Sequence, residues 1–157
     1  MHNTEIERKF LVDRDAWSLL VKPEGTAYVQ GYLSIDAYKV VRVRLAGNKG
    51  FITIKGKSET ISRPEYEYEI PQEDAVELLG QFTAANIEKV RTRIPVGAHV
   101  WEVDEFHGEN EGLLLAEIEL ENQEDHFDLP AWAGKEVTGD MRYYNSYLSL
   151  HPFVTWK

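Results

Sequence analysis

Residues 5–12 read Glu-Ile-Glu-Arg-Lys-Phe-Leu-Val, with ionisable side chains at positions 5, 7 and 9. In a β-strand, successive side chains point to opposite faces, so Glu5, Glu7 and Lys9 would share one face. Taken alone, this stretch is typical of a strand with one face in solvent. Later segments repeat the same alternation, and this repetition indicates that the pattern in residues 5–12 belongs to a feature of the whole fold.

The composition predicts one globular domain that spans residues 1–157. Of the 157 residues, 43% are hydrophobic and 28% are charged, which suits a domain with a buried core. Cysteine is absent, so disulfides and thiolate metal sites are excluded, and a metal would have to bind carboxylate or histidine side chains. A cysteine-free chain fits the reducing cytoplasm, which is the expected location.

The charge balance narrows the range of partners. Lys and Arg number 17 against 27 Asp and Glu, and the net charge of −10 would repel a long phosphate backbone. Extended nucleic-acid binding is therefore not expected, although a local basic cluster could hold a small polyanion. The start of the chain lacks the basic and apolar pattern of a signal peptide, and no apolar stretch is long enough for a membrane span, so no membrane association is expected.

Hydrophobic periodicity predicts an α+β chain that is mainly β. Short helices are expected over residues 13–21, over 72–84 and from about residue 140, and Gly47 with Asn48 predicts a hairpin turn. Eight strands are a number compatible with closure into a barrel. The expected strands cover residues 5–12, 27–36, 40–46, 50–57, 64–70, 87–95, 100–106 and 113–121.

Within these strands, ionisable side chains alternate with apolar ones, and the sign of the charge is nearly uniform along each strand. The third, fourth and sixth strands carry the bases Arg42, Arg44, Lys55, Lys89, Arg91 and Arg93. The fifth, seventh and eighth carry the acids Glu65, Glu67, Glu69, Glu102, Asp104, Glu117, Glu119 and Glu121.

Two architectures are compatible with this pattern. One is an ordinary sandwich with solvated charged faces and ion pairs between strands. The other is a closed antiparallel barrel whose charged face lines a lumen and whose apolar face is covered by helices. Like charges along one strand repel, and a bound polyanion with divalent cations would offset this repulsion. We therefore favour the barrel, in which Glu5, Glu67, Lys89 and Glu119 point inward and Val43, Ile54, Tyr66 and Ile118 point outward beneath helices.

The charged residues also form an ordered series of short motifs. E-x-E-x-K at residues 5–9 is followed by R-x-R at 42–44, T-x-K at 53–55, E-x-E at 65–67, K-x-R at 89–91, Asp104 and E-x-E at 117–119. In this series the chain resembles the CYTH superfamily, the triphosphate tunnel metalloenzymes, over nearly its whole length. The segments at 30–33, 88–91 and 136–143 strengthen the likeness. The resemblance implies an eight-stranded antiparallel tunnel that binds triphosphates and acts with Mg²⁺ or Mn²⁺.

The resemblance also implies roles for individual residues. The implied metal ligands are Glu5, Glu7, Glu117 and Glu119, with Glu65, Glu67 and Asp104 as additional carboxylates for a second metal or its waters. The implied phosphate-contacting bases are Lys9, Arg42, Arg44, Lys55, Arg91 and Arg142. The chemistry agrees, because hard divalent cations favour oxygen ligands and Arg can grip two phosphate oxygens.

In members similar to short bacterial tripolyphosphatases, a Tyr and a Lys lie near the attacking water, and here these would be Tyr32 and Lys89. Lumen carboxylates are expected to raise the pKa of Lys89, which favours a role in positioning the water. The expected reaction is hydrolysis of the terminal phosphate of a small triphosphate, foremost inorganic tripolyphosphate. The alternatives are an adenylyl cyclase, a thiamine or nucleoside triphosphatase, and a non-catalytic module that binds polyphosphate or nucleotide.

Overall fold

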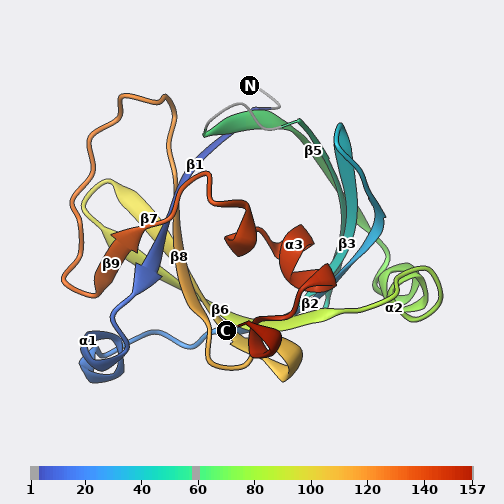
Figure 1. Cartoon of the computed structure of the whole chain (residues 1–157), viewed down its shortest axis with the longest axis horizontal. Coiled ribbons are helices and arrows are strands. Elements are labelled where there is room, and N and C mark those ends of the chain that lie inside the picture. The colour runs from blue at the N-terminus through green and yellow to red at the C-terminus, as the bar shows by residue number, and fades with distance from the viewer. Residues whose placement is uncertain (1–3, 58–60, 157) are drawn as a thin grey trace.

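The computed structural model describes residues 4–57 and 61–156, and these fold into an antiparallel barrel (Figure 1). Neighbouring strands follow the order β5-β4-β3-β2-β6-β7-β8-β1, and β1 pairs with β5 to close the ring. The prediction of a closed eight-stranded antiparallel barrel is confirmed. The barrel strands are β1 (Thr4–Val12), β2 (Thr26–Ile35), β3 (Lys39–Ala46), β4 (Lys49–Gly56), β5 (Ser62–Ile70), β6 (Ile87–Val96), β7 (His99–His107) and β8 (Leu114–Glu119).

A ninth strand, β9 (Ala133–Glu136), was not predicted from the sequence. It pairs with the C-terminal half of β1, where Phe10 faces Glu136 and Val12 faces Ala133. The N-terminal half of β1 pairs with β5 instead, through Thr4 to Ile6. The four residues of β9, Ala-Gly-Lys-Glu, have no alternation and low β-propensity, so pairing with β1 and not local preference makes them a strand.

The helices are shorter than predicted. On the outside of the barrel lie α1 (Arg14–Leu19) and α2 (Gln72–Gln81) (Figure 1). A Cβ on Gly50 would lie 2.7 Å from Ala75 Cβ, so glycine at this position lets α2 pack closely on β4. In the described part of the chain, no helix has the length and apolar character needed to cross a bilayer.

The final helix does not begin at residue 140 as predicted. Asp140 caps a short 3₁₀ helix, η2 (Met141–Tyr143), by accepting a hydrogen bond from the backbone N–H of Arg142. Tyr144 is extended, and only then does α3 (Asn145–Leu150) begin. A further 3₁₀ helix, η3 (Phe153–Thr155), follows, and another, η1 (Gly108–Asn110), links β7 to β8. Two separate helical pieces therefore replace the one expected helix.

Strand register places the alternating charges on the inner face of the barrel. Glu7 faces Glu119 and Lys9 faces Glu117 across β1 and β8, while Arg91 faces Asp104 across β6 and β7. The outward face of β1, β6, β7 and β8 forms an apolar cluster with Trp17 of α1 and Trp132, and Val43 packs with Ala75 and Leu79 of α2. These two apolar clusters therefore lie outside the barrel.

Toward one end of the barrel, the inner face changes from charged to apolar. Alternate residues of a strand point to the same face. The inward positions that hold Lys9, Lys89, Asp104 and Glu117 are therefore followed, toward this end, by inward positions that hold Leu11, Ile87, Phe106 and Leu115. These side chains pack with the C-terminal segment (residues 137–156), whose Leu148 is fully buried against them. Seen down the barrel, α3 lies within the ring of strands (Figure 1). The C-terminal segment thus forms a floor at this end.

The prediction that helices cover the whole apolar face was wrong for part of it. Val43 and Ile118 are fully buried, but Ile54 is 40% exposed and Tyr66 is 43% exposed. Both exposed residues lie on the β4–β5 side, where α2 packs against Ile52 and Ile70 instead. A helix of 10 residues is too short to cover the full length of both strands.

This difference predicts different costs for one substitution at two isoleucines of the outer face. Ile118→Ala would leave a cavity in the packed cluster and should lower the free energy of unfolding by about 2–5 kcal/mol. Ile54→Ala, at the uncovered position, should cost less than about 1 kcal/mol. Urea denaturation of both variants measures the difference, and equal losses would contradict the placement of the core.

Candidate active site

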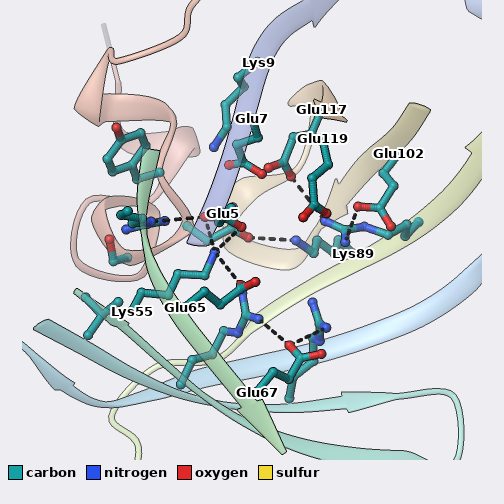
Figure 2. Close-up of a pocket in the computed structure, with 18 of the residues that line it drawn as sticks. Glu5, Glu7, Lys9, Lys55, Glu65, Glu67, Lys89, Glu102, Glu117 and Glu119 are labelled. Atoms are coloured by element: carbon teal, nitrogen blue, oxygen red, sulfur yellow. Dashed lines mark hydrogen bonds and ion pairs between the residues drawn. The ribbon is translucent and has the colours of Figure 1, made fainter. Parts of the chain in front are cut away.

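The barrel encloses a cavity of about 180 Å³ whose walls are almost entirely ionisable. Acids and bases from β1, β3, β4, β5, β6 and β8 converge on it (Figure 2). At the floor, Tyr144, Asn145 and Ser146 of the C-terminal segment complete the lining. The site is therefore a polar chamber inside the barrel and not a groove on its surface.

On the β1–β4–β5 side, one carboxylate forms ion pairs with two bases. Glu5 accepts from Lys55 Nζ at 2.9 Å and from Arg63 Nε at 3.2 Å. Lys55 also lies 3.4 Å from Glu65. These side chains come from strands that are distant in sequence, and barrel closure brings them together (Figure 2).

Two arginines of β3 project into the cavity beside Glu67. Arg42 and Arg44 lie 3.4 and 3.2 Å from the same Glu67 oxygen, and the Nε–H of each is buried without an acceptor among the described residues. Burial and the nearby Arg42 lower the pKa of Arg44 to about 10. Unmet donors and crowded positive charge both favour an incoming anion at this wall.

On the β6–β7 side, Asp104 is fully buried between two bases. Arg91 grips it with two hydrogen bonds of 2.7 and 2.8 Å, and Lys89 Nζ lies 2.8 Å from its second oxygen. Arg91 also reaches Glu102 at 3.1 Å and Glu117 at 3.2 Å. Asp104 therefore holds the side chains of both bases in position.

The environment of Lys89 differs from the sequence-based expectation. Burial lowers the pKa of Lys89 to about 8; Asp104 opposes this shift and Arg91 reinforces it. The expectation that lumen carboxylates would raise this pKa was wrong, because desolvation outweighs them. A lysine with this pKa is a better proton acceptor near neutral pH than an ordinary one.

The remaining carboxylates of the cavity lie close to one another. Burial raises the pKa of Glu7 well above its ordinary value, and the charges of Glu117 and Glu5 add to the shift. Burial and Glu5 also raise the pKa values of Glu119 and Glu65. Burial alone would raise the pKa of Glu117, but Lys9 and Arg91 lower it well below the ordinary value. On this side of the cavity, full ionisation of the carboxyl groups is therefore opposed by burial and by mutual repulsion.

Comparison with known proteins identifies the family. Residues 3–146 match the CYTH domain. The chain belongs to the CYTH domain family. An inorganic triphosphatase from Acetivibrio thermocellus is 50% identical over 98% of this chain and 97% of its own length. An inorganic triphosphatase from Nitrosomonas europaea is 35% identical over 94% of this chain and 97% of its own length. A solved structure of an inorganic triphosphatase is 32% identical, with a TM-score of 0.64 over 93% of this chain and 97% of that one.

Membership of the CYTH family implies a divalent metal, and the donor set fits one. Glu5, Glu7, Glu117 and Glu119 offer only oxygen atoms, which hard cations prefer. A cation among them would relieve the repulsion from Glu117 and Glu5, which adds to the effect of burial on the pKa of Glu7. Among residues 4–57 and 61–156, no group of three or more acidic or histidine side chains is already arranged so that it could hold a metal ion. Phosphate oxygens and water would therefore complete the ligand shell.

The CYTH cavity gathers most of the site residues predicted from the sequence. Those that line it are Glu5, Glu7, Lys9, Tyr32, Arg42, Arg44, Lys55, Glu65, Glu67, Lys89, Arg91, Glu117 and Glu119. Asp104 does not line it; instead of facing a metal, it holds Lys89 and Arg91. Arg142 does not line it either, since its exposed side chain pairs with Asp140 at 2.7 Å on η2.

Arg63, Tyr144 and Asn145 are among the lining residues that were missed in the sequence. Arg63 shares its inward parity with Glu65 and Glu67 on β5, so the alternation alone could have indicated it. Tyr144 lies between two bases, with Lys9 Nζ 5.1 Å and the Arg63 guanidinium carbon 5.4 Å from its ring centre. Neither Tyr144 nor Asn145 belongs to a barrel strand, so the alternation within the strands did not indicate them.

The raised pKa of Glu7 predicts how the stability of the metal-free CYTH domain depends on pH. The carboxyl of Glu7 binds its proton more tightly in the folded state than in the unfolded state. As the pH rises above the ordinary pKa of a glutamate, the unfolded state loses this proton first, and the folded state becomes progressively less stable. Glu7→Gln should therefore raise the melting midpoint in EDTA by about 2–4 °C at pH 8, and by less at pH 5. Glu105→Gln, at an exposed position of β7, is the control and should change neither value. An equal gain at both pH values would contradict the assignment.

Proposed function

We propose that this protein hydrolyses the terminal phosphate of a small linear triphosphate, with inorganic tripolyphosphate as the preferred substrate. The observation that carries the proposal is the pair of unmet, buried Nε–H donors of Arg42 and Arg44 in a chamber that also holds a cluster of carboxylates on β1 and β8. Bases meet the phosphate oxygens, and carboxylates hold the cation that accompanies a triphosphate.

Two further observations support an inorganic substrate. The curated relatives at 50% and 35% identity are named inorganic triphosphatase. The cavity of about 180 Å³ is also smaller than the roughly 300–1,000 Å³ typical of sites for drug-sized ligands. A bare phosphate chain suits this volume better than a whole nucleotide does.

For the metal, we propose Mg²⁺ or Mn²⁺ held by Glu5, Glu7, Glu117 and Glu119, with Glu65 and Glu67 available to a second ion or its waters. When bound, the ion supplies charge neutralisation on the transferred phosphoryl group. To bind in this way, Glu5 must exchange part of its pairing with Lys55 and Arg63. The bases so released are those that meet the phosphate chain.

The protein's own side chains then have separable tasks. We assign Lys9, Arg42, Arg44, Lys55 and Arg91 to fixing the phosphate chain and stabilising the charge that develops in the transition state. Lys89, with Tyr32, orients the attacking water, and the neutral form of Lys89 can accept the proton of that water. The water oxygen bonds to the terminal phosphorus, the bridging P–O bond breaks, and pyrophosphate leaves. We place this reaction in the cytoplasm.

A phosphate-release assay over several triphosphates tests the substrate. We expect kcat/KM with Mg²⁺ or Mn²⁺ to be higher for tripolyphosphate than for ATP, thiamine triphosphate or pyrophosphate. Formation of cyclic AMP from ATP is measured in the same samples. Equal or faster turnover of ATP, or cyclic AMP as the main product, would overturn the substrate assignment.

Two variants connect this turnover to the cavity. Arg42→Ala removes a charged hydrogen-bond donor and should raise KM by about 10- to 100-fold. Arg14→Ala removes an arginine whose side chain contacts the Gly112 carbonyl outside the cavity, and it should leave KM unchanged.

Metal removal should act on both activity and stability. EDTA should abolish turnover, and saturating Mg²⁺ should raise the melting midpoint, because an ion that binds only the folded state stabilises it. Glu119→Gln should lose most activity and most of this Mg²⁺-dependent shift. The control, Glu105→Gln, should keep both. Full turnover in EDTA would argue against a metal-dependent reaction.

A further inference from the structure

The floor of the cavity is joined to its chemistry by one amide side chain. Asn145, the first residue of α3, accepts hydrogen bonds at Oδ1 from Lys89 Nζ at 2.9 Å and from Gln30 Nε2 at 3.0 Å. We propose that Asn145 is a positioning residue, which fixes the Lys89 ammonium for catalysis. The inference rests on the proposed function and adds to it a residue outside the barrel strands.

The chemistry of the three groups fixes how they are oriented. An ammonium has only donors, so the atom of Asn145 that faces Lys89 must be its carbonyl oxygen. The same oxygen then needs a donor from Gln30, which turns the amide nitrogen of Gln30 toward it. The Gln30 oxygen is left buried without a partner among the described residues, as expected if the contact with Asn145 determines this orientation.

Lys89 is held from two directions that do not depend on each other. Asp104 reaches its Nζ from β7 at 2.8 Å, and Asn145 reaches it from α3. A flexible four-carbon side chain with a single anchor can still swing about that anchor, whereas two anchors restrict the position of the ammonium. A neutral amide supplies the second anchor without adding another charge to the pair.

The position of Asn145 itself is secured by packing. Leu148, one turn later in α3, is fully buried in the apolar floor with Phe106 and Leu115. Lys9 Nζ also donates to the Tyr143 carbonyl at 3.1 Å, just before the helix. The C-terminal segment is therefore held independently of Asn145, and substitution of Asn145 should leave the floor in place.

The test compares two substitutions of similar size. Asn145→Asp keeps an oxygen acceptor for Lys89, whereas Asn145→Leu removes it. We expect Asn145→Leu to lower kcat by about 10-fold or more with KM changed less than about threefold. Asn145→Asp, which keeps the acceptor but adds a negative charge beside Lys89, should lower kcat less than Asn145→Leu does. Ser149→Ala, a nearby change in α3 outside the cavity lining, should match the wild type in kcat and melting midpoint.

A double-mutant cycle separates positioning from a structural role. If Asn145 acts through Lys89, Asn145→Leu should have no further effect on kcat in the Lys89→Ala background, measured at high enzyme concentration. Losses that multiply in the double variant would overturn the inference, and so would equal impairment of the Asp and Leu variants. Asn145→Ala provides a second removal of the acceptor if the Leu variant melts below the wild type.

Failure of this inference differs from failure of the proposed function. Wild-type protein that releases no phosphate from tripolyphosphate would reject the function. An active wild type whose Asn145→Leu variant retains kcat within twofold would reject only the role of Asn145.

Discussion

Charge compensation across a closed barrel is the constraint on which this structure depends. Buried ions are costly unless partners are placed close to them, and strands of nearly uniform sign cannot supply those partners within themselves. Pairing between strands solves this problem: closure places Glu5 of β1 against Lys55 and Arg63, and the β6–β7 hairpin places Asp104 against Arg91. The compensation is incomplete, because Glu7 and Glu119 keep raised pKa values while Arg42 and Arg44 keep unmet donors. A triphosphate with its cation matches both deficits.

Much of the fold could be predicted because a period of two is a strong signal. Alternation from Arg42 to Lys55 and from Glu65 to Glu67 specified the strands and the side chains that share one face of each strand. The Gly47–Asn48 turn was equally clear, since Gly47 adopts a positive φ of 60° between the paired residues Ala46 and Lys49. Each of these features is local, so a single sequence contains enough information to reveal it.

The features that were missed depend on contacts made after the barrel has formed. β9 is a strand only because β1 offers it a free edge, and Ile54 stays exposed only because α2 ends too early to cover it. Asn145 enters the site from a helix whose own sequence has no catalytic pattern. The desolvation that lowers the pKa of Lys89 is a property of the whole chamber, and counting charges along strands pointed to the opposite shift.

The apolar floor built on Leu11, Phe106, Leu115 and Leu148 has a consequence for kinetics. A chamber that is closed at one end exchanges its contents through its other openings, so an arriving substrate and the departing products compete for the same passage. In the proposed reaction, pyrophosphate keeps two of the three phosphates of the substrate, so we expect it to leave more slowly than orthophosphate. Turnover would then be sensitive to the concentration of pyrophosphate, and other reactions that remove pyrophosphate would raise the flux through this protein.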